Sequence, residues 1–192
     1  MKDIILIGGG GHCRSVIDVI EQEGLFSIVG IVDRPEKLGK KVLGYPIIGD
    51  DSDLSSLTKR YQYALVTVGQ IKSASLRVDL FNRAVKAGFS MPSIVSPHAY
   101  VSKSAVLGKG TIVMHSALVN TGTTIGDNCI INSKALIEHD CHISEHCHIS
   151  TNVTVNGGST VGRESFVGSG AITRELAVID NGSFVKAGSL VL

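Results

Sequence analysis

Residues 99–192 read AYVSKS AVLGKG TIVMHS ALVNTG TTIGDN CIINSK ALIEHD CHISEH CHISTN VTVNGG STVGRE SFVGSG AITREL AVIDNG SFVKAG SLVL when they are divided into groups of six. The third residue of every group, from Val101 to Val191, is aliphatic except Thr173, and no insertion breaks the period. The first residue is nearly always small. A hexapeptide period of this kind predicts a parallel β-helix, in which each coil buries its inner face against its neighbours.

A slower period of 18 residues lies on top of the period of six. An aliphatic residue followed by a small or polar one recurs at this spacing, as in Leu107-Gly108, Ile125-Gly126 and Val161-Gly162. Three groups of six therefore make one turn of a coil that is triangular in cross-section. About five turns at the ~4.8 Å spacing of paired strands give a prism roughly 25 Å tall.

The cysteines Cys13, Cys129, Cys141 and Cys147 are not expected to form disulfides. The last three occupy first places of their groups, where Ala and Ser also occur. This placement predicts that they are small buried fillers in a reducing compartment.

The charges of the whole chain are balanced, with 18 Lys and Arg against 17 Asp and Glu. No excess of positive charge favours nucleic acid or an anionic membrane as a partner. Met1 leads into a predicted strand, with no signal peptide and no apolar run of about 18 residues. We therefore expect a cytoplasmic protein that neither binds nucleic acid nor inserts into a membrane.

The residues before the repeat predict an α/β domain. An apolar strand over residues 3–7 runs into Gly8-Gly9-Gly10-Gly11-His12, after which residues 15–20 have helical spacing. Further elements are expected over residues 28–32, 64–68 and about 73–87. The order strand, glycine turn, helix is typical of a nucleotide-binding unit. The chain is thus expected to have a Rossmann-like domain over residues 1–93 and a β-helix over residues 94–192, joined by an extended, proline-bracketed crossing.

The glycine turn does not match a dinucleotide fingerprint fully. Cys13 occupies the third glycine position, where a larger residue opposes the close packing that NAD or FAD binding needs. The turn still presents backbone N–H groups at a helix N-terminus, where a phosphate is favoured. Asp33, directly after the second strand, could contact a ribose or a base.

This opening followed by a hexapeptide prism resembles the PglD-like and NeuD-like sugar acetyltransferases of bacterial glycan synthesis. Residues 44–51, GYPIIGDD, match the GYPVLGD stretch of that family, and Val68-Gly69 with Arg77 resembles its xGxxxxR segment. The resemblance covers nearly the whole chain. It implies a left-handed coil, acetyl-CoA as the donor substrate, and an N-terminal domain that holds the acceptor, often a nucleotide sugar. The acceptor-binding residues it implies are Gly8, Gly10, Gly11, His12, Asp33, Gly69 and Arg77. Without the resemblance, His12 is interpreted as a surface residue at a helix entry.

Residues 135–152 are rich in histidine, so a zinc site has to be considered. In the six-residue register, Cys141 and Cys147 point inward on two different faces, whereas His142 and His148 point outward. Four ligands do not converge in this arrangement. We expect no metal.

Residues 18 apart stack one coil above another, which places His139 between Thr121 and Gly157, and Asp140 between Gly122 and Gly158. Gly157 and Gly158 leave room for a flat thioester, and the Gly157 N–H is a candidate donor to an oxyanion. His139 is the candidate general base, with Asp140 or else Glu138 orienting its ring. The alternative is that His139 and Asp140 form only a polar corner. For the column of Asn120, Glu138 and Asn156 we favour a structural hydrogen-bonding ladder.

The resemblance supports the catalytic reading, because residues 137–141, IEHDC, coincide with the family's IEHxC segment around its catalytic histidine. His148 matches a second functional histidine of the family, in CHIS. It falls on another face from His139, so we predict that it meets His139 of a neighbour in a homotrimer with shared active sites. The residues expected to bind acetyl-CoA are His148, Gly157, Gly158, Ser169 and Gly170. The family chain usually continues past a GSGSVV-like segment into a further stretch that helps hold coenzyme A, whereas this chain ends at Leu192.

The predicted function is transfer of an acetyl group from acetyl-CoA to an amino group of a nucleotide-linked sugar in bacterial surface-glycan synthesis. One alternative is O-acetylation of a sialic-acid-type sugar. Another is a trimer that binds a nucleotide sugar without catalysis.

Overall fold

The computed structural model describes residues 1–192 and divides into two compact units. The first unit comprises Met1–Gly69 and Ser75–Pro92, and the second comprises Gln70–Ala74 and Ser93–Leu192. The short segment Gln70–Ala74 therefore belongs with the second unit, although the residues on both sides of it belong with the first. The sequence gives no sign of this excursion.

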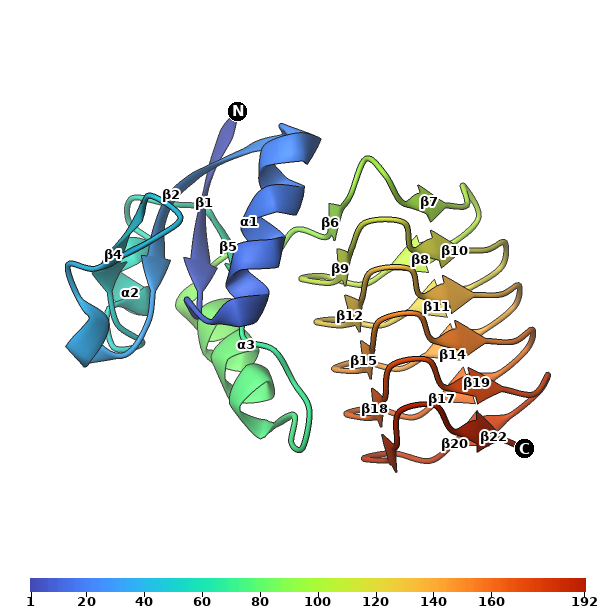
Figure 1. Ribbon diagram of the computed structural model, residues 1–192. Coiled ribbons are helices and arrows are strands. Elements are labelled where there is room, and N and C mark those ends of the chain that lie inside the picture. Colours follow the sequence, from blue (N-terminus) through green and yellow to red (C-terminus); the bar gives the residue numbers. More distant parts are fainter. The chain divides into compact units, whose positions relative to one another are not determined.

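The first unit is a Rossmann-like α/β domain with a five-stranded sheet in the order β3-β4-β2-β1-β5 (Figure 1). All neighbours pair in parallel except β3 and β4. The strands are β1 (Lys2–Ile7), β2 (Phe26–Val32), β3 (Lys41–Val42), β4 (Tyr45–Gly49) and β5 (Tyr63–Val66). The helices are α1 (Gly11–Glu23), α2 (Leu54–Leu57), α3 (Ser75–Ala87) and the 3-10 helix η1 (Pro35–Lys37).

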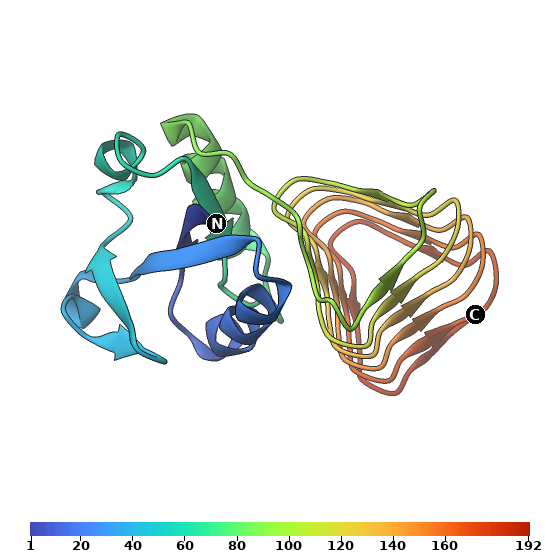
Figure 2. The same cartoon turned by 90° about the horizontal axis from the view of Figure 1, so that it is seen from above.

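Helices cover both faces of this sheet, with α1 on one side and α2 and α3 on the other (Figures 1 and 2). The strand β1 lies between β2 and β5, and its last four residues are fully buried. Ile5 and Ile7 pack with Leu54, Leu80 and Phe81 from α2 and α3. A continuous apolar run is what a parallel strand needs when both of its faces are covered.

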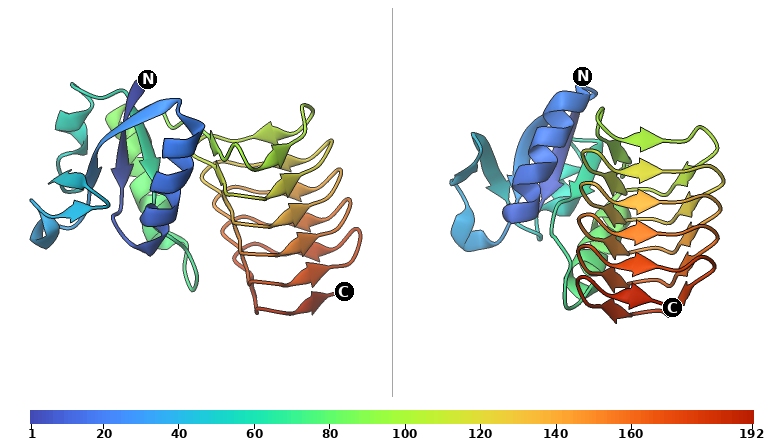
Figure 3. Two further views of the ribbon diagram at one scale, coloured as in Figure 1. Left: turned by 45° about the horizontal axis from the view of Figure 1, so that its top comes forward. Right: turned by 45° about the vertical axis from the view of Figure 1, so that its right-hand side comes forward.

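The second unit is a left-handed parallel β-helix, seen as a stack of coils in Figure 3 and as a triangular cross-section in Figure 2. Its strands are two residues long and form three parallel sheets. The first coil sheet contains β7 (Tyr100–Val101), β10 (Leu118–Val119), β13 (Leu136–Ile137), β16 (Thr154–Val155), β19 (Ile172–Thr173) and β22 (Leu190–Val191). The second coil sheet contains β8 (Val106–Leu107), β11 (Thr124–Ile125), β14 (His142–Ile143), β17 (Thr160–Val161) and β20 (Val178–Ile179). The third coil sheet contains β6 (Ile94–Val95), β9 (Ile112–Val113), β12 (Ile130–Ile131), β15 (His148–Ile149), β18 (Phe166–Val167) and β21 (Phe184–Val185).

The stacking follows the predicted period of 18 residues. Leu118 pairs with Leu136, and Ile143 pairs with Val161. The third-place residues point inward and form one continuous core with the small first-place residues. The two periods read from the sequence are therefore confirmed.

The small first-place residues do more than fill space. At eight of these places, Thr, Cys or Ser donates its side-chain hydrogen to the main-chain oxygen 15 residues later, in the next coil. The bonds run from Ser93, Thr111, Thr123, Cys129, Cys141, Cys147, Ser159 and Ser165. All four cysteines of the chain are free and buried. The three in the coil donate hydrogen bonds to carbonyl groups at its turns. From the sequence, they were expected only to fill space, and this role was not predicted.

No helix of the protein combines the length and the apolar character that crossing a membrane requires.

We expect Thr111→Val to destabilise the coil more than Thr111→Ser. Thr111 is fully buried, its hydroxyl donates to Gly126 O at 2.8 Å, and it accepts the Cys129 N–H at 2.9 Å. Valine leaves both partners unsatisfied, at a cost of about 1–3 kcal/mol, whereas serine removes only one methyl group, worth about 0.8 kcal/mol. Urea unfolding midpoints measure the difference. A valine variant at least as stable as the serine variant would contradict this role of the hydroxyl.

Candidate active site

His139 and Asp140 occupy the corner of the coil that follows β13. The Asp140 N–H donates to Thr121 O at 2.9 Å, and the Gly158 N–H donates to His139 O at 2.9 Å. Asp140 has a φ of 57°, the left-handed conformation that turns the chain at this corner. The predicted stacking of Thr121, His139 and Gly157 is therefore what the structure shows.

The two side chains at this corner are hydrogen-bonded, with 2.9 Å between His139 Nδ1 and Asp140 Oδ2. The carboxylate accepts only, so Nδ1 carries the proton and Nε2 keeps its lone pair. The hydrogen bond to Asp140 raises the pKa of His139. The negative charges of Asp140 and Glu138 act in the same direction, against the opposing effect of burial. Both side chains are more than half exposed, so Nε2 is open to a substrate.

Gly157 lies directly against the His139 ring. A Cβ atom at this position would be 2.7 Å from Nε2 and 2.8 Å from Cε1. Glycine is therefore required for the space in front of Nε2. Gly158 has a φ of 66°, and a Cβ atom there would be 2.6 Å from Leu176 Cδ2, so two independent reasons keep it small.

Asp140, and not Glu138, orients the histidine. Glu138 Oε2 accepts a hydrogen bond from Asn120 Nδ2 at 2.8 Å and one from the His139 N–H at 3.3 Å. Glu138 thus lies in a column of polar side chains and makes no hydrogen bond to the imidazole. This pair is the structural ladder expected for the column. Asn156 does not continue it, because its side chain turns to Thr173 in the next coil.

His148 lies on another face, in the third coil sheet, and is 7% exposed. Its Nδ1 hydrogen-bonds the carbonyl oxygen of Gln70, and its Nε2 is 3.1 Å from Asn132 Nδ2. Its ring packs edge-on against Phe166, with 5.2 Å between the centroids. His148 points outward from the coil core, as its second place in the group predicts, but Gln70 of the segment Gln70–Ala74 lies against it and leaves it buried. This segment lies outside the repeat, so the register could not show it.

The remaining predicted donor residues do not gather at one place. Ser169 and Gly170 follow β18 and occupy a different corner from His139 and Gly157. Ser169 Oγ hydrogen-bonds the hydroxyls of Ser150 and Thr151 at 3.0 and 2.8 Å. At Gly170 the surrounding space is open. Within one chain, the expected acetyl-CoA-binding residues are therefore divided between two corners.

In the first unit, Asp33 holds the glycine turn from inside. Its Oδ2 accepts the Gly9 N–H at 2.8 Å and Lys37 Nζ at 2.8 Å, and its Oδ1 accepts the Arg34 N–H at 2.7 Å. Burial alone would raise the pKa of Asp33, but these three hydrogen bonds outweigh it, so the net shift is downward. Asp33 is 9% exposed. In the structure, Asp33 fixes the glycine turn. From the sequence, only a contact with a ribose or a base was expected, and this role was not predicted.

The open part of the turn is its later half. Gly8 is tightly packed and has a φ of 103°, whereas Gly10 and Gly11 have no neighbour within 4 Å of a Cβ position. Gly10 is the N-cap of α1 and Gly11 is the first of its 13 residues, and no side chain caps this end of the helix. Next to them, the Cβ atom of His12 lies 3.6 Å from the Cβ position of Gly69. Gly10, Gly11, His12 and Gly69 therefore lie together at one edge of the sheet, at the N-terminus of α1, and the N-terminus of a helix favours a phosphate.

Arg77 does not belong to this edge. It is 1% exposed, and its Nη1 donates to the carbonyl oxygens of Val66 and Val68, both at 2.8 Å. The guanidinium satisfies the end of β5 and is not available to an acceptor. The prediction that Arg77 binds the acceptor is wrong, because a buried arginine needs those carbonyl partners.

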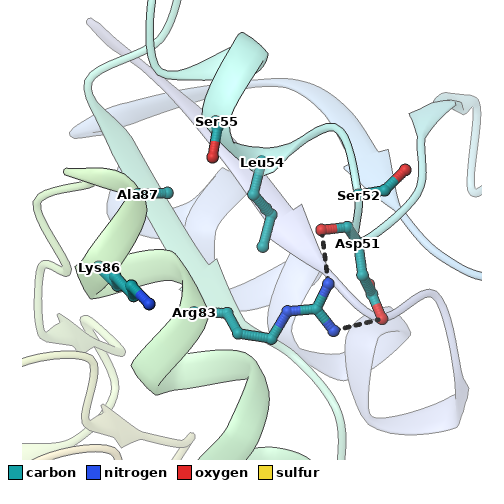
Figure 4. A pocket seen from close by; sticks show the side chains of 7 residues that line it. All are labelled: Asp51, Ser52, Leu54, Ser55, Arg83, Lys86 and Ala87. Atoms are coloured by element: carbon teal, nitrogen blue, oxygen red, sulfur yellow. Dashed lines mark hydrogen bonds and ion pairs between the residues drawn. The ribbon is translucent and has the colours of Figure 1, made fainter.

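A separate hollow of about 340 Å³ is lined by residues of α2, of α3 and of the turn before α2 (Figure 4). Its lining residues are Asp51, Ser52, Leu54, Ser55, Arg83, Lys86 and Ala87. Figure 4 shows Arg83 directed at Asp51, whose carbonyl oxygen accepts from Nη2 at 2.8 Å. Asp79 lies 3.5 Å from the same guanidinium, so the positive charge of Arg83 is already compensated. None of the predicted acceptor residues lines this hollow, and we do not assign the acceptor to it.

Ligand-type side chains do not cluster in this protein. No group of three or more His, Cys, Asp or Glu residues is arranged to hold a metal ion. Burial raises the pKa of the Cys13 thiol to about 11 and also raises that of Cys141. These thiols are poor nucleophiles and poor ligands.

Comparison with known proteins gives matches over the whole chain. Residues 3–83 match the model of the PglD N-terminal domain. The acetyltransferase domain of PglB from Neisseria gonorrhoeae, in complex with acetyl coenzyme A, is 31% identical. The match covers 100% of this chain and 91% of that one, with a TM-score of 0.92. The chain belongs to the PglD-like sugar acetyltransferases.

A second similar structure is described with two ligands, CoA and a nucleotide sugar. PerB from Caulobacter crescentus, in complex with CoA and GDP-perosamine, is 34% identical, and the match covers 100% of this chain and 89% of that one, with a TM-score of 0.92. WeeI from Acinetobacter baumannii, at 16% identity and a TM-score of 0.57, shares the fold. No curated protein sequence is significantly similar to the chain.

The glycine turn of this PglD-like protein gives a matched pair of variants. Gly9→Ala would put a Cβ atom 2.9 Å from Asp33 Oδ2 and 3.2 Å from Val42 Cγ2, whereas Gly10→Ala would meet nothing within 4 Å. We expect Gly9→Ala to cost about 1.5–3 kcal/mol of unfolding free energy, the range for a hydrogen bond to a charged group. Gly10→Ala should stay within about 0.5 kcal/mol of wild type. Equal losses in chemical denaturation would rule out the bracing role of Asp33.

Proposed function

We propose that the protein transfers an acetyl group from acetyl-CoA to an amino group of a nucleotide-linked sugar, in bacterial surface-glycan synthesis. The observation that carries this proposal is the placement of His139 Nε2 against the bare backbone of Gly157. Two relatives support the substrate classes, because one is described in complex with acetyl coenzyme A and the other with CoA and GDP-perosamine.

The geometry supports a direct transfer with one general base. The amine of the sugar attacks the thioester carbonyl while His139 Nε2 takes the proton that the nitrogen loses. Asp140, on Nδ1, holds the tautomer and stabilises the imidazolium that forms. When the tetrahedral intermediate collapses, the carbon–sulfur bond breaks and the thiolate of CoA takes the proton from His139. The nitrogen gains the acetyl group, and no covalent enzyme intermediate is needed.

The Gly157 N–H is the proposed donor to the oxyanion. It belongs to the residue that faces Nε2, and glycine leaves room for the carbonyl group of the thioester. A donor of this kind is worth about 3–4 kcal/mol in acyl transfer. Gly158 keeps the neighbouring space open for the donor substrate. For the nucleotide part of the acceptor we propose the edge formed by Gly10, Gly11, His12 and Gly69.

We also propose that the protein works as a homotrimer with shared active sites. Apart from Thr154, the outward residues of the first coil sheet form an apolar column, and Tyr100, Ile172 and Leu190 in it are 59%, 45% and 64% exposed. The strand β13 of this sheet leads into the corner that holds His139. A ring of three prisms would bury the column, and it could bring the Ser169 and Gly170 corner of one chain to the His139 corner of the next.

Release of the CoA thiol tests the proposed activity. We expect turnover with acetyl-CoA and a UDP- or GDP-linked amino sugar, and a loss of roughly 10²- to 10⁴-fold in His139→Ala, the range for removal of a general base. Equal rates for the two proteins would exclude His139 as the base. Turnover with sialic acids only would establish the O-acetylation alternative. Nucleotide-sugar binding without thiol release would establish the non-catalytic alternative.

The pH dependence of the rate separates Asp140 from a merely structural residue. Only neutral His139 accepts a proton, so the rate falls as the pH drops through its pKa. Because the Asp140 hydrogen bond raises that pKa, the acidic limb should lie above about pH 6.5, the ordinary value for histidine. In Asp140→Asn the limb should move to lower pH and the plateau fall by about 10- to 100-fold. An unmoved limb would contradict the assignment.

Disruption of the apolar column tests the trimer. Ile172→Asp puts a charge where subunits are proposed to meet, and we expect a monomer by light scattering and a loss of activity of at least about 10-fold. Leu38→Asp, at a residue 60% exposed outside the coil, is the control and should change neither property. A wild-type protein that is active as a monomer would overturn the shared site.

A further inference from the structure

The hydrogen-bond ladder of the coil has one exception. As a rule, the N–H of the fourth residue of a group of six donates to the carbonyl oxygen of the third residue of the group stacked on it in the next coil, 17 residues later. Asn120 to Ile137 and Glu138 to Val155 are examples, both at 2.9 Å. From Ser96 to Arg174, every fourth residue follows this rule except Asn156. The exception immediately precedes Gly157.

Thr173 is the cause of the exception. The Asn156 N–H donates to Thr173 Oγ1 at 2.9 Å, and Asn156 Nδ2 donates to Thr173 O at 2.6 Å. The carbonyl oxygen only accepts, so the amide nitrogen must be the atom that faces it. As a result, β16 and β19 pair only through Thr154 and Ile172. Thr173 is also the one third-place residue that is not aliphatic, so the break in the ladder coincides with the break in the sequence pattern.

The polar groups around this break are satisfied by a short buried relay. Ser159 Oγ donates to Arg174 O at 3.1 Å, so the hydroxyl of Thr173, 3.3 Å away, is the donor to Ser159 Oγ. Thr173 Oγ1 then keeps a lone pair for the Asn156 N–H. Both hydroxyls are almost completely buried. Each group has a partner, so the arrangement is a stable alternative to the regular ladder.

The consequence falls on the N–H of Gly157. At Asn120 and Asn132, the side-chain oxygen accepts the N–H of the next residue at 2.8 Å, and Glu138 does the same for His139 at 3.3 Å. Asn156 cannot do so while its amide is turned to Thr173. No other acceptor in the chain bonds the Gly157 N–H. An unbonded N–H therefore lies on the residue that faces His139 Nε2.

We propose that Thr173 and Asn156 are positioning residues, which keep the Gly157 N–H free to bind the oxyanion of the acetyl-transfer step. This inference rests on the proposed function and deepens it. A side-chain acceptor on that N–H would compete with the oxyanion, and its displacement would be an added cost in the transition state. A donor that is free beforehand needs no such rearrangement.

Thr173→Val tests the inference, because valine is the ordinary residue at the third place and nearly isosteric with threonine. Without Oγ1, the Asn156 N–H returns to the carbonyl of residue 173. This displaces the Asn156 amide, which then accepts the Gly157 N–H as Asn120 does for Thr121. We expect kcat to fall about 10- to 100-fold, within the range for a lost oxyanion donor. KM for acetyl-CoA should stay within about twofold, and the thermal midpoint should be equal or higher.

Two further variants separate positioning from stability. Thr173→Ser keeps the hydroxyl, so kcat should stay near wild type while the thermal midpoint falls with the lost methyl group. Thr173→Val with Asn156→Ala has no side-chain acceptor for the Gly157 N–H, so it should recover most of the kcat lost in Thr173→Val. Recovery in this double variant would support the inference.

The inference is overturned if Thr173→Val has the kcat of wild type, or if kcat and thermal stability fall together in both Thr173→Val and Thr173→Ser. The proposed function is judged separately by His139→Ala. An inactive His139→Ala with a fully active Thr173→Val would retain the function and reject the positioning role.

Discussion

The repeat of inter-coil hydrogen bonds is the constraint on which the second unit depends. Each coil pairs its strands only with the coils directly before and after it, and its aliphatic third-place residues have no other core to enter. Residues 18 apart are therefore fixed one above another along the chain. An interval of 18 residues in the sequence therefore means direct stacking in space. His139 lies against Gly157 because they are in neighbouring coils, and no contact between distant coils is needed.

The same constraint explains why polar side chains are tolerated inside the coil. The turn carbonyls would be costly if buried without partners, and the small hydroxyl and thiol groups of the first place supply the donors. Thr, Cys and Ser are suitable because they combine a small volume with a donor. Substitution among these three preserves both properties, so the repeat tolerates variation there that would be costly at the third place.

The sequence could predict what the repeat determines and little of what lies outside it. The triangular coil and the stacking of His139, Asp140, Gly157 and Gly158 follow from counting in sixes and eighteens. The surroundings of His148 could not be obtained in this way, because Gln70 comes from a segment with no period and a sequence separation of 78 residues. Arg77 was misassigned for a related reason. A motif identifies a residue type, but its partners, Val66 O and Val68 O, are known only from the fold.

Thr173 shows how an exception to a strong pattern can carry information. Valine at this place would complete the aliphatic column and the hydrogen-bond ladder, so the threonine forgoes a regular arrangement that the rest of the coil uses. Departures from otherwise consistent rules are expected to concentrate at functional sites. Here the departure lies in the coil above Gly157, and through Asn156 it affects the N–H of Gly157, the residue that lies against the His139 ring. On the proposed role, the broken pattern has a physical reason, because threonine at this single position turns the Asn156 amide away from the Gly157 N–H and still leaves the buried polar groups partnered.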